Sequence, residues 1–432
     1  MNRSSFLVAG ALLTATASCA SDPADTQPPA DDIATTESPV TDPPTTAPSA
    51  TTPAITAAPE TTEAPTTDVP VTDAPATTIA AAADVPEDRY DFSAIDAIVS
   101  SFVDERGLNG AGLVIVDDQD GVVHQDYWGD FDVDRISLVA SSSKMVTAGV
   151  LLRLQDEGLL DIDAPVADVV PWGDANPLVT PAQLVSNSSG LPGLFGGLTI
   201  GSYLCQYGAE GSMQDCGETI FTTAEDDDSV RPPDTEFEYG GAQWQVAGAV
   251  AEAASGKSWA ELIDEIYVQP CGLETLAFNN HFAQIGAGGF DYPTEFNSDP
   301  TTLQPTDNPN MEGGMYVTTG DYAKLLLMHL RGGMCGDTPV LSQESLDVMH
   351  ADRIADVYAG DAASPDTGYG MGWWVDRPSG RISDGGAYGS VPWLDLEDGY
   401  GAYLVIEANS ATGGELAGLL YDVVDEAHAA TS

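Results

Sequence analysis

The pattern of apolar and polar positions becomes regular near residue 93 and predicts a helix followed by a β-hairpin. Across residues 93–106 apolar side chains recur on one side, as in an amphipathic helix, and Gly107 marks its end. Two apolar segments, residues 111–116 and 122–128, then flank a polar turn at residues 118–121, which is typical of two antiparallel strands.

The middle of the chain has helical periodicity, and the C-terminal part has strand periodicity. Helices are predicted over residues 145–157, 242–254, 259–268, 321–330 and 416–427, and strands over residues 136–139, 371–375, 381–383, 391–396 and 403–407. Thr318 and Asp321 have the spacing of a capping box at the start of one helix. The order predicts an α+β fold, in which an antiparallel sheet is flanked by N- and C-terminal helices and a large helical insert forms a second lobe. A cleft between the lobes is the natural place for a pocket.

The first 19 residues have the pattern of a secretion signal. Arg3 precedes an apolar stretch and small residues, and Cys19 follows them. Cleavage after Ala17 and cleavage before Cys19 both fit. We favour the second, in which Cys19 carries a lipid as in bacterial lipoproteins, over an incidental cysteine in a discarded signal.

Residues 20–85 consist mainly of Thr, Pro, Ala and acidic residues, and they contain no Lys or Arg. Such a composition cannot build an apolar core, so this segment is predicted to be an extended linker. Residues 86–432 contain all seven tryptophans and form the predicted folded domain.

Four cysteines follow the linker, namely Cys205, Cys216, Cys271 and Cys335. An even number in an exported protein favours disulfides. Cys205 with Cys216 would close a short loop, and Cys271 with Cys335 would join two distant segments. The sequence does not separate this pairing from the other two.

The net charge of −55 argues against some partners. Binding to nucleic acids or anionic membrane surfaces needs a basic patch, and a chain with 13 Lys and Arg residues and 68 Asp and Glu residues cannot supply one. The expected partner is a small-molecule or peptide substrate, and membrane contact is expected only through a lipid on Cys19.

The candidate chemistry lies at Ser141, because Lys144, one of only three lysines, follows it by three residues. At the start of a helix this spacing places both side chains on one face, so that a desolvated amine can activate the hydroxyl. The N-terminus of the helix would also favour a developing oxyanion. The alternative is a capping serine followed by a solvated lysine.

Four stretches in order strengthen the first interpretation. The first is Ser141 to Lys144 together with residues 159–166, and the second is residues 179–192, which include Ser188-Ser189-Gly190. The third is Tyr239-Gly240-Gly241, and the fourth is Ser383 to Ala387, which follows a pair of tryptophans. Together they resemble the serine β-lactamase and penicillin-binding-protein superfamily, particularly its class C-like branch of esterases and D-aminopeptidases. The resemblance covers residues 93–427 and implies a β-lactamase/transpeptidase-like fold.

The resemblance also implies roles for particular residues. Tyr239 would be the second acid/base beside Ser141 and Lys144, although a core tyrosine with a satisfied hydroxyl is the alternative. The backbone N–H groups of Ser141 and Ala387 would form an oxyanion hole. Substrate contacts are expected at Gly241, Asp384, Gly385 and Gly386.

Two positions depart from the family pattern. Gly241 stands where the family commonly has Asn, and Asp384 stands where it commonly has Lys or His. The second change would repel the carboxylate of a penicillin, unless Arg381 compensates; Arg381 could equally pair with a surface acid.

We therefore expect a secreted or surface-anchored serine hydrolase that cleaves an ester or amide through an acyl-enzyme, with no metal or cofactor required. The five histidines lack HExxH spacing and no G-x-S-x-G motif occurs, which argues against zinc proteases and α/β-hydrolases. The alternatives are a DD-peptidase or β-lactamase and a non-catalytic binding protein of the same fold.

Overall fold

The computed structural model describes residues 89–431 apart from 195–200, 209–210, 224–226, 286–290, 294–298 and 356–364. The predicted signal, the lipidation at Cys19 and the linker of residues 20–85 lie outside the described residues. No described helix is long and apolar enough to cross a bilayer.

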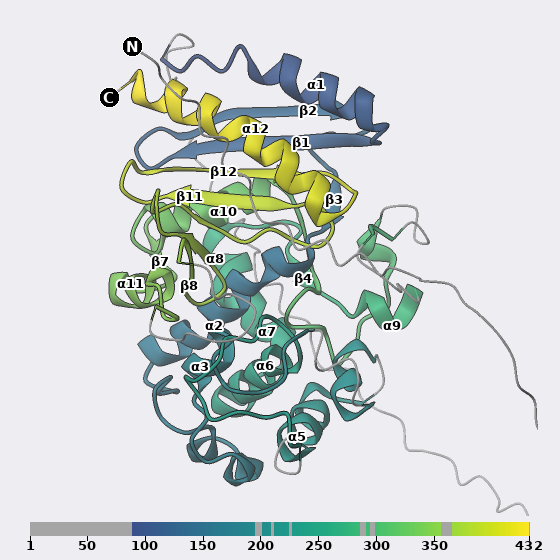
Figure 1. Ribbon diagram of the computed structural model, residues 1–432, viewed down its shortest axis with the longest axis vertical. Helices are drawn as coiled ribbons and strands as arrows, with labels where there is room; N and C mark the ends of the chain where they lie inside the picture. Colours follow the sequence, from purple (N-terminus) through teal and green to yellow (C-terminus); the bar gives the residue numbers. More distant parts are fainter. Residues whose placement is uncertain are drawn as a thin grey trace, which may run out of the picture. The chain divides into compact units, whose positions relative to one another are not determined.

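The domain is organised around a seven-stranded antiparallel sheet with strand order β2-β1-β12-β11-β10-β9-β8 (Figure 1). Its strands are β1 (Gly110–Asp117), β2 (Gly121–Gly129), β8 (Thr367–Tyr369), β9 (Trp374–Asp376), β10 (Ile382–Ser383), β11 (Val391–Asp395) and β12 (Tyr400–Val405). The N-terminal hairpin pairs with the last strand, with Val114 opposite Tyr403. The two ends of the domain are therefore neighbours.

Helices cover both faces of the sheet. α1 (Ile95–Arg106) and α12 (Ser410–Ala429) contact each other on one face, as Figure 1 shows. Leu113 and Ile115 belong to the core on that side, whereas Val114 and Val116 face the larger core that includes α2 (Lys144–Asp156) and α10 (Thr319–Leu330). Because side chains alternate along β1, this strand contributes to two cores, one on each face of the sheet.

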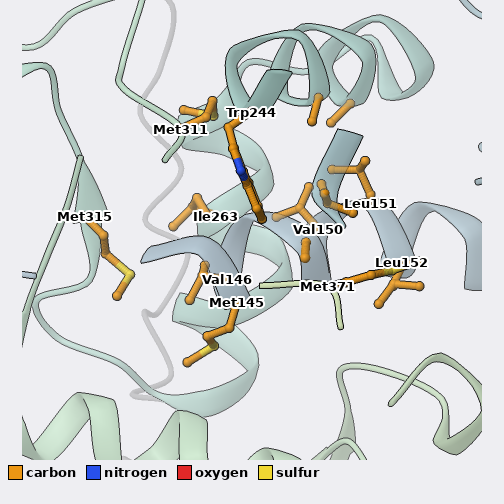
Figure 2. Close-up of a cluster of buried hydrophobic side chains, with 14 of the residues drawn as sticks. Met145, Val146, Val150, Leu151, Leu152, Trp244, Ile263, Met311, Met315 and Met371 are labelled. Carbon is orange, nitrogen blue, oxygen red and sulfur yellow. The ribbon is translucent and has the colours of Figure 1, made fainter. Parts of the chain in front are cut away.

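The helical part of the domain contains α2 and several further helices. These are α3 (Pro181–Val185), α5 (Met213–Thr223), α6 (Ala242–Ser255), α7 (Trp259–Ile263), α8 (Gln269–Cys271), α9 (His281–Ile285) and α11 (Gln343–His350). Of these, α3, α6 and α11 contact α2. Figure 2 shows Val146 and Val150 of α2 among Trp244, Ile263 and Met311. Because α2 is buried on nearly every side, the hydroxyl and amine at its start are held by a rigid core.

A second sheet has three strands, and one of them leads into the segment that contains Ser141. β3 (Ile136–Leu138) pairs with β5 (Met315–Thr318), and β5 pairs with β4 (Ala277–Phe278). A two-stranded ribbon, β6 (Met334–Cys335) with β7 (Thr338–Pro339), follows α10. The β3–β5 pairing brings the segment before Met315 next to the segment after Leu138.

The cysteines form the disulfides Cys205–Cys216 and Cys271–Cys335, with Cα–Cα distances of 5.7 and 4.9 Å. The first closes a loop of the helical lobe. The second joins the end of α8 to β6, so it connects segments that lie 64 residues apart.

Two local predictions differ from the structure in detail. Residues 259–268 are helical as predicted, but α7 ends at Ile263 and a π-helical turn (Asp264–Val268) continues into α8. The capping box at α10 is half formed: Asp321 N donates to Thr318 Oγ1 at 3.3 Å, but Asp321 Oδ2 accepts from the backbone of Glu274 and Thr275. Asp321 therefore ties α10 to the loop after α8 instead of closing its own cap.

Candidate active site

Ser141 lies in a single 3₁₀ turn, Ala140–Ser143, between β3 and α2. The preceding residue, Ala140, has φ of +46°, a left-handed conformation that is strained for a residue with a Cβ. The turn is fixed on both sides, since Met315 N donates to Ser143 Oγ at 3.1 Å and Val139 N donates to Met315 O at 3.1 Å. Ser141 as a whole is half-buried, unlike the buried residues on either side of it.

Lys144 is the buried partner of Ser141. Its side chain is 1% exposed, and its Nζ donates to Ser141 Oγ at 3.0 Å and to the carbonyl oxygen of Glu312 at 2.8 Å. The amine also lies 4.9 Å from the ring centroid of Tyr239. Burial lowers the pKa of Lys144, and the charges of Glu312 and Asp384 oppose this effect. A half-buried serine therefore lies beside a desolvated amine.

Tyr239 enters the site from the loop before α6. Its hydroxyl interacts with the side chains of Ser141 and Trp374, and its ring stacks on Trp374 with centroids 5.0 Å apart. Burial raises the pKa of Tyr239 well above 10.0, and the charge of Asp384 adds to this shift. The phenol is thus a neutral group that can donate a proton near Ser141 Oγ.

The loop after β10 is joined by hydrogen bonds to the turn Ala140–Ser143 and to Val139 before it. Ser142 Oγ donates to Asp384 O at 2.6 Å, and Ser390 Oγ donates to Val139 O at 2.7 Å. Ala387 packs in the cluster that contains Ala140, the residue before Ser141. A Cβ on Gly386 would meet Val139 O at 2.1 Å, so a glycine is required for this approach.

The expected substrate contacts differ in exposure. Gly385 is exposed, Gly386 is buried, and Asp384 is 0% exposed. No described residue donates a hydrogen bond to either carboxyl oxygen of Asp384. Burial raises the pKa of Asp384 well above 3.8, although Lys144 opposes the shift. This carboxyl therefore lies beneath the surface of the site, where the neutral acid is favoured.

Arg381 does not extend toward Ser141. It is bound to Asp425, with Nη2 2.7 Å from Oδ2, and its guanidinium lies 4.4 Å from the ring centroid of Tyr421. Of the two possibilities that the sequence left open, the structure has the pair with an acid of α12.

Glu312 is a site residue that sequence reasoning missed. Its side chain is 8% exposed, and Oε2 lies 3.8 Å from Lys144 Nζ. Oε2 accepts from Gly241 N at 2.7 Å, and Oε1 accepts from the Tyr207 hydroxyl at 2.8 Å. The carboxylate therefore occupies space beside Gly241 where the family commonly has an amide side chain. No local pattern marks Glu312, because Lys144 lies 168 residues before it.

Gly240 and Gly241 make this arrangement possible. Both have positive φ, +69° and +80°, and a Cβ on Gly240 would meet Glu312 Oε2 at 2.7 Å. Among the described residues, no group of three or more His, Cys, Asp or Glu side chains is arranged to hold a metal ion.

A fold of this kind with a serine and a buried lysine at the start of the central helix defines the β-lactamase/transpeptidase-like superfamily, whose members include serine hydrolases. The chain belongs to the β-lactamase family, whose model matches residues 95–426. This confirms the fold and the superfamily that the sequence motifs indicated.

Three related proteins illustrate the range of this family. Penicillin-binding protein 4 of Amycolatopsis lactamdurans is 27% identical over 351 residues, which are 74% of this chain and 85% of the relative. Esterase EstB of Burkholderia gladioli is 28% identical over 207 residues, 43% of this chain and 50% of the esterase. A crystal structure of a candidate β-lactamase from Bacteroides dorei has a TM-score of 0.61 at 26% identity and covers 78% of this chain and 99% of its own.

Proposed function

We propose that the protein hydrolyses an ester or amide through an acyl-enzyme on Ser141, with Lys144 and Tyr239 as acid/base groups. The observation that carries this proposal is the 3.0 Å contact between Lys144 Nζ and Ser141 Oγ, in which the amine is buried and the serine is a half-buried residue. A desolvated amine in hydrogen-bond reach of a hydroxyl is the arrangement that activates a serine.

The residues divide the chemistry as follows. Ser141 Oγ attacks the carbonyl carbon while its proton passes to the Lys144–Tyr239 pair, and the N–H groups of Ser141 and Ala387 stabilise the oxyanion. The pair then returns the proton to the leaving alcohol or amine as the bond to the acyl carbon breaks. Water attacks the acyl-Ser141 ester in a second, similar round, which releases the acid and restores the serine.

The test is covalent labelling of the domain with a fluorophosphonate, which reacts with activated serines. We expect stoichiometric labelling that Ser141→Ala abolishes and that Ser101→Ala, at an exposed serine of α1, leaves intact. A protein that folds normally but takes no label from any serine-directed probe is a binding protein of this fold, and the proposal would then be abandoned.

The rival function is that of a DD-peptidase or β-lactamase, which the similarity to a penicillin-binding protein favours. A screen of nitrophenyl esters, D-peptides and nitrocefin separates the two. Ester turnover without acylation by penicillin supports the esterase-like function, and acylation of Ser141 by penicillin supports the rival.

We also propose that the protein is exported and held at the cell surface by a lipid on Cys19. The signal-like residues 1–19 and the two disulfides of the domain support this location. Expression with Cys19→Ala should move the protein from the membrane fraction to the medium. Unchanged fractionation would contradict the lipid anchor.

A further inference from the structure

Glu312 forms a buried contact with the reacting groups that neither the family pattern nor the mechanism above explains. Its carboxylate is fixed by two donors, the backbone N–H of Gly241 at 2.7 Å and the Tyr207 hydroxyl at 2.8 Å. Its backbone carbonyl accepts from Lys144 Nζ at 2.8 Å, so both ends of the residue face the amine.

The chain around Glu312 is built to hold it there. Tyr207 ends the 3₁₀ segment Gly201–Tyr207, which contains one half of the disulfide Cys205–Cys216. Asn308 Nδ2 donates to the carbonyl of Cys205 at 2.9 Å, and Asn310 Nδ2 donates to that of Gln206 at 3.1 Å. The segment that carries Glu312 and the segment that carries Tyr207 are therefore bound to each other at several points.

The other charged or titratable groups that face Lys144 come from two further elements. Asp384 approaches from the loop after β10, and the Tyr239 phenol approaches from the loop before α6. Asp384 is fully buried without a donor to its carboxyl oxygens among the described residues, whereas Glu312 has two donors and a cation 3.8 Å away. Hydrogen bonds and a nearby cation stabilise a carboxylate, and of these two acids only Glu312 has both in the described part of the chain.

We propose that Glu312 is a positioning and specificity-determining residue: it holds Lys144 against Ser141 in place of the missing side-chain amide, and it selects substrates that carry no carboxylate near the scissile bond. The inference rests on the proposed function. A negative charge beside the nucleophile disfavours anionic acyl groups and accepts neutral or cationic ones.

The proposal is tested by Glu312→Gln, which keeps the size of the side chain and removes its charge. Two nitrophenyl esters of equal length are compared, one neutral and one with a terminal carboxylate on the acyl group. Wild type should prefer the neutral ester, and the preference should fall about tenfold in Glu312→Gln. Glu252→Gln, at a half-buried glutamate of α6 that binds Gln214 and the Trp259 amide, is the matched control and should leave the ratio unchanged.

The second readout is the pH profile of kcat/KM for the neutral ester. Glu312 raises the pKa of Lys144, so its neutralisation should move the acidic limb, which the amine sets as the base, to lower pH. A residue with a purely structural role would lower the rate without moving this limb. An unmoved limb together with an unchanged ester ratio would overturn the inference.

Fluorophosphonate labelling of wild type keeps the two proposals apart. A wild type that fails to label contradicts the acyl-enzyme itself, whereas a wild type that labels, with a Glu312→Gln variant that behaves like Glu252→Gln, contradicts only the role of Glu312. If circular dichroism shows that Glu312→Gln does not fold, Tyr207→Phe carries the test. Loss of the hydroxyl that fixes Oε1 should lower kcat for the neutral ester about fivefold, and an unchanged kcat would refute the positioning role.

Discussion

The backbone at Gly241 predicts that restoring the family's asparagine there will destabilise the protein. Gly241 has φ of +80° and ψ of −163°, a region of backbone conformation that is open essentially only to glycine. A Cβ at this position would lie 2.7 Å from the carbonyl carbon of Gly193 and 2.9 Å from Pro192 O. Both contacts are with backbone atoms, so neither can be relieved by a rotamer change.

The magnitude follows from these two terms. A non-glycine residue in such a conformation costs about 1–3 kcal/mol. Overpacking against fixed atoms costs a further ~1–3 kcal/mol. Gly241→Asn should therefore lose about 2–6 kcal/mol of free energy of unfolding, a large part of the 5–15 kcal/mol that is typical of a domain.

A matched control separates backbone strain at this site from the general effect of adding asparagine. Gly256 ends α6 with φ of +70° and ψ of 17°, and a Cβ there would have no neighbour within 4 Å. Asparagine tolerates this left-handed conformation, so Gly256→Asn should lose less than about 1 kcal/mol. Urea denaturation followed by tryptophan fluorescence compares the variants. Equal midpoints for Gly241→Asn and Gly256→Asn would refute the reasoning.

Three further predictions concern the amine, the buried acid and the disulfides. Lys144→Met should lower kcat/KM for a neutral ester by about 10²–10⁴, whereas Lys257→Met, at a lysine 41% exposed, should leave it unchanged; equal losses would contradict the assignment of Lys144. The raised pKa of Asp384 means that the folded state binds its proton more tightly than the unfolded state, so stability is lost as pH rises from about 4 through the folded pKa. Asp384→Asn should therefore unfold at higher urea than wild type at pH 8, and the difference should shrink toward pH 4; parallel curves would contradict it. Loss of loop entropy predicts that removing the disulfide Cys271–Cys335 by a double substitution to serine lowers the free energy of unfolding by about 4 kcal/mol, because its loop spans 64 residues. Removing Cys205–Cys216 in the same way should lower it by about 3 kcal/mol, because that loop spans 11 residues. Calorimetry that reverses this order would count against the entropic account.

Segments with strong periodicity were predicted well. The N-terminal helix, the hairpin of β1 and β2, and the strands β11 and β12 were visible because their apolar positions repeat regularly. The beginning of α12 was not predicted. Its first turn starts at Ser410 under an Asn409 cap and contains Gly413, whose missing Cβ lets the helix contact the backbone of Gly389. This first turn is stabilised by a close contact between backbones, so it lacks the apolar periodicity that would have predicted a helix.

In the candidate site, residues close in sequence could be predicted together from their spacing, whereas residues distant in sequence could not. Ser141 and Lys144 are three residues apart, so helical spacing alone brought them together in the prediction. Tyr239 was placed by similarity to a family motif, and its position in the structure is beside Ser141. Glu312 had neither signal, because the pairing of β3 with β5 and the contacts of Tyr207 place it at the amine. Such a residue becomes visible only when the topology is known.

The acidity of the whole chain and the acidity of the site have separate effects. At physiological salt, exposed charges more than about 8 Å away are largely screened, so most of the net charge of −55 acts weakly on a buried amine. A carboxylate 3.8 Å away interacts with that amine by about 4 kcal/mol at an effective dielectric constant near 20. Glu312 therefore outweighs many surface acids in its effect on Lys144. The pKa of the lysine depends on the balance between its burial, which lowers it, and the neighbouring acids Glu312 and Asp384, which raise it, so we expect a change at Glu312 to alter it.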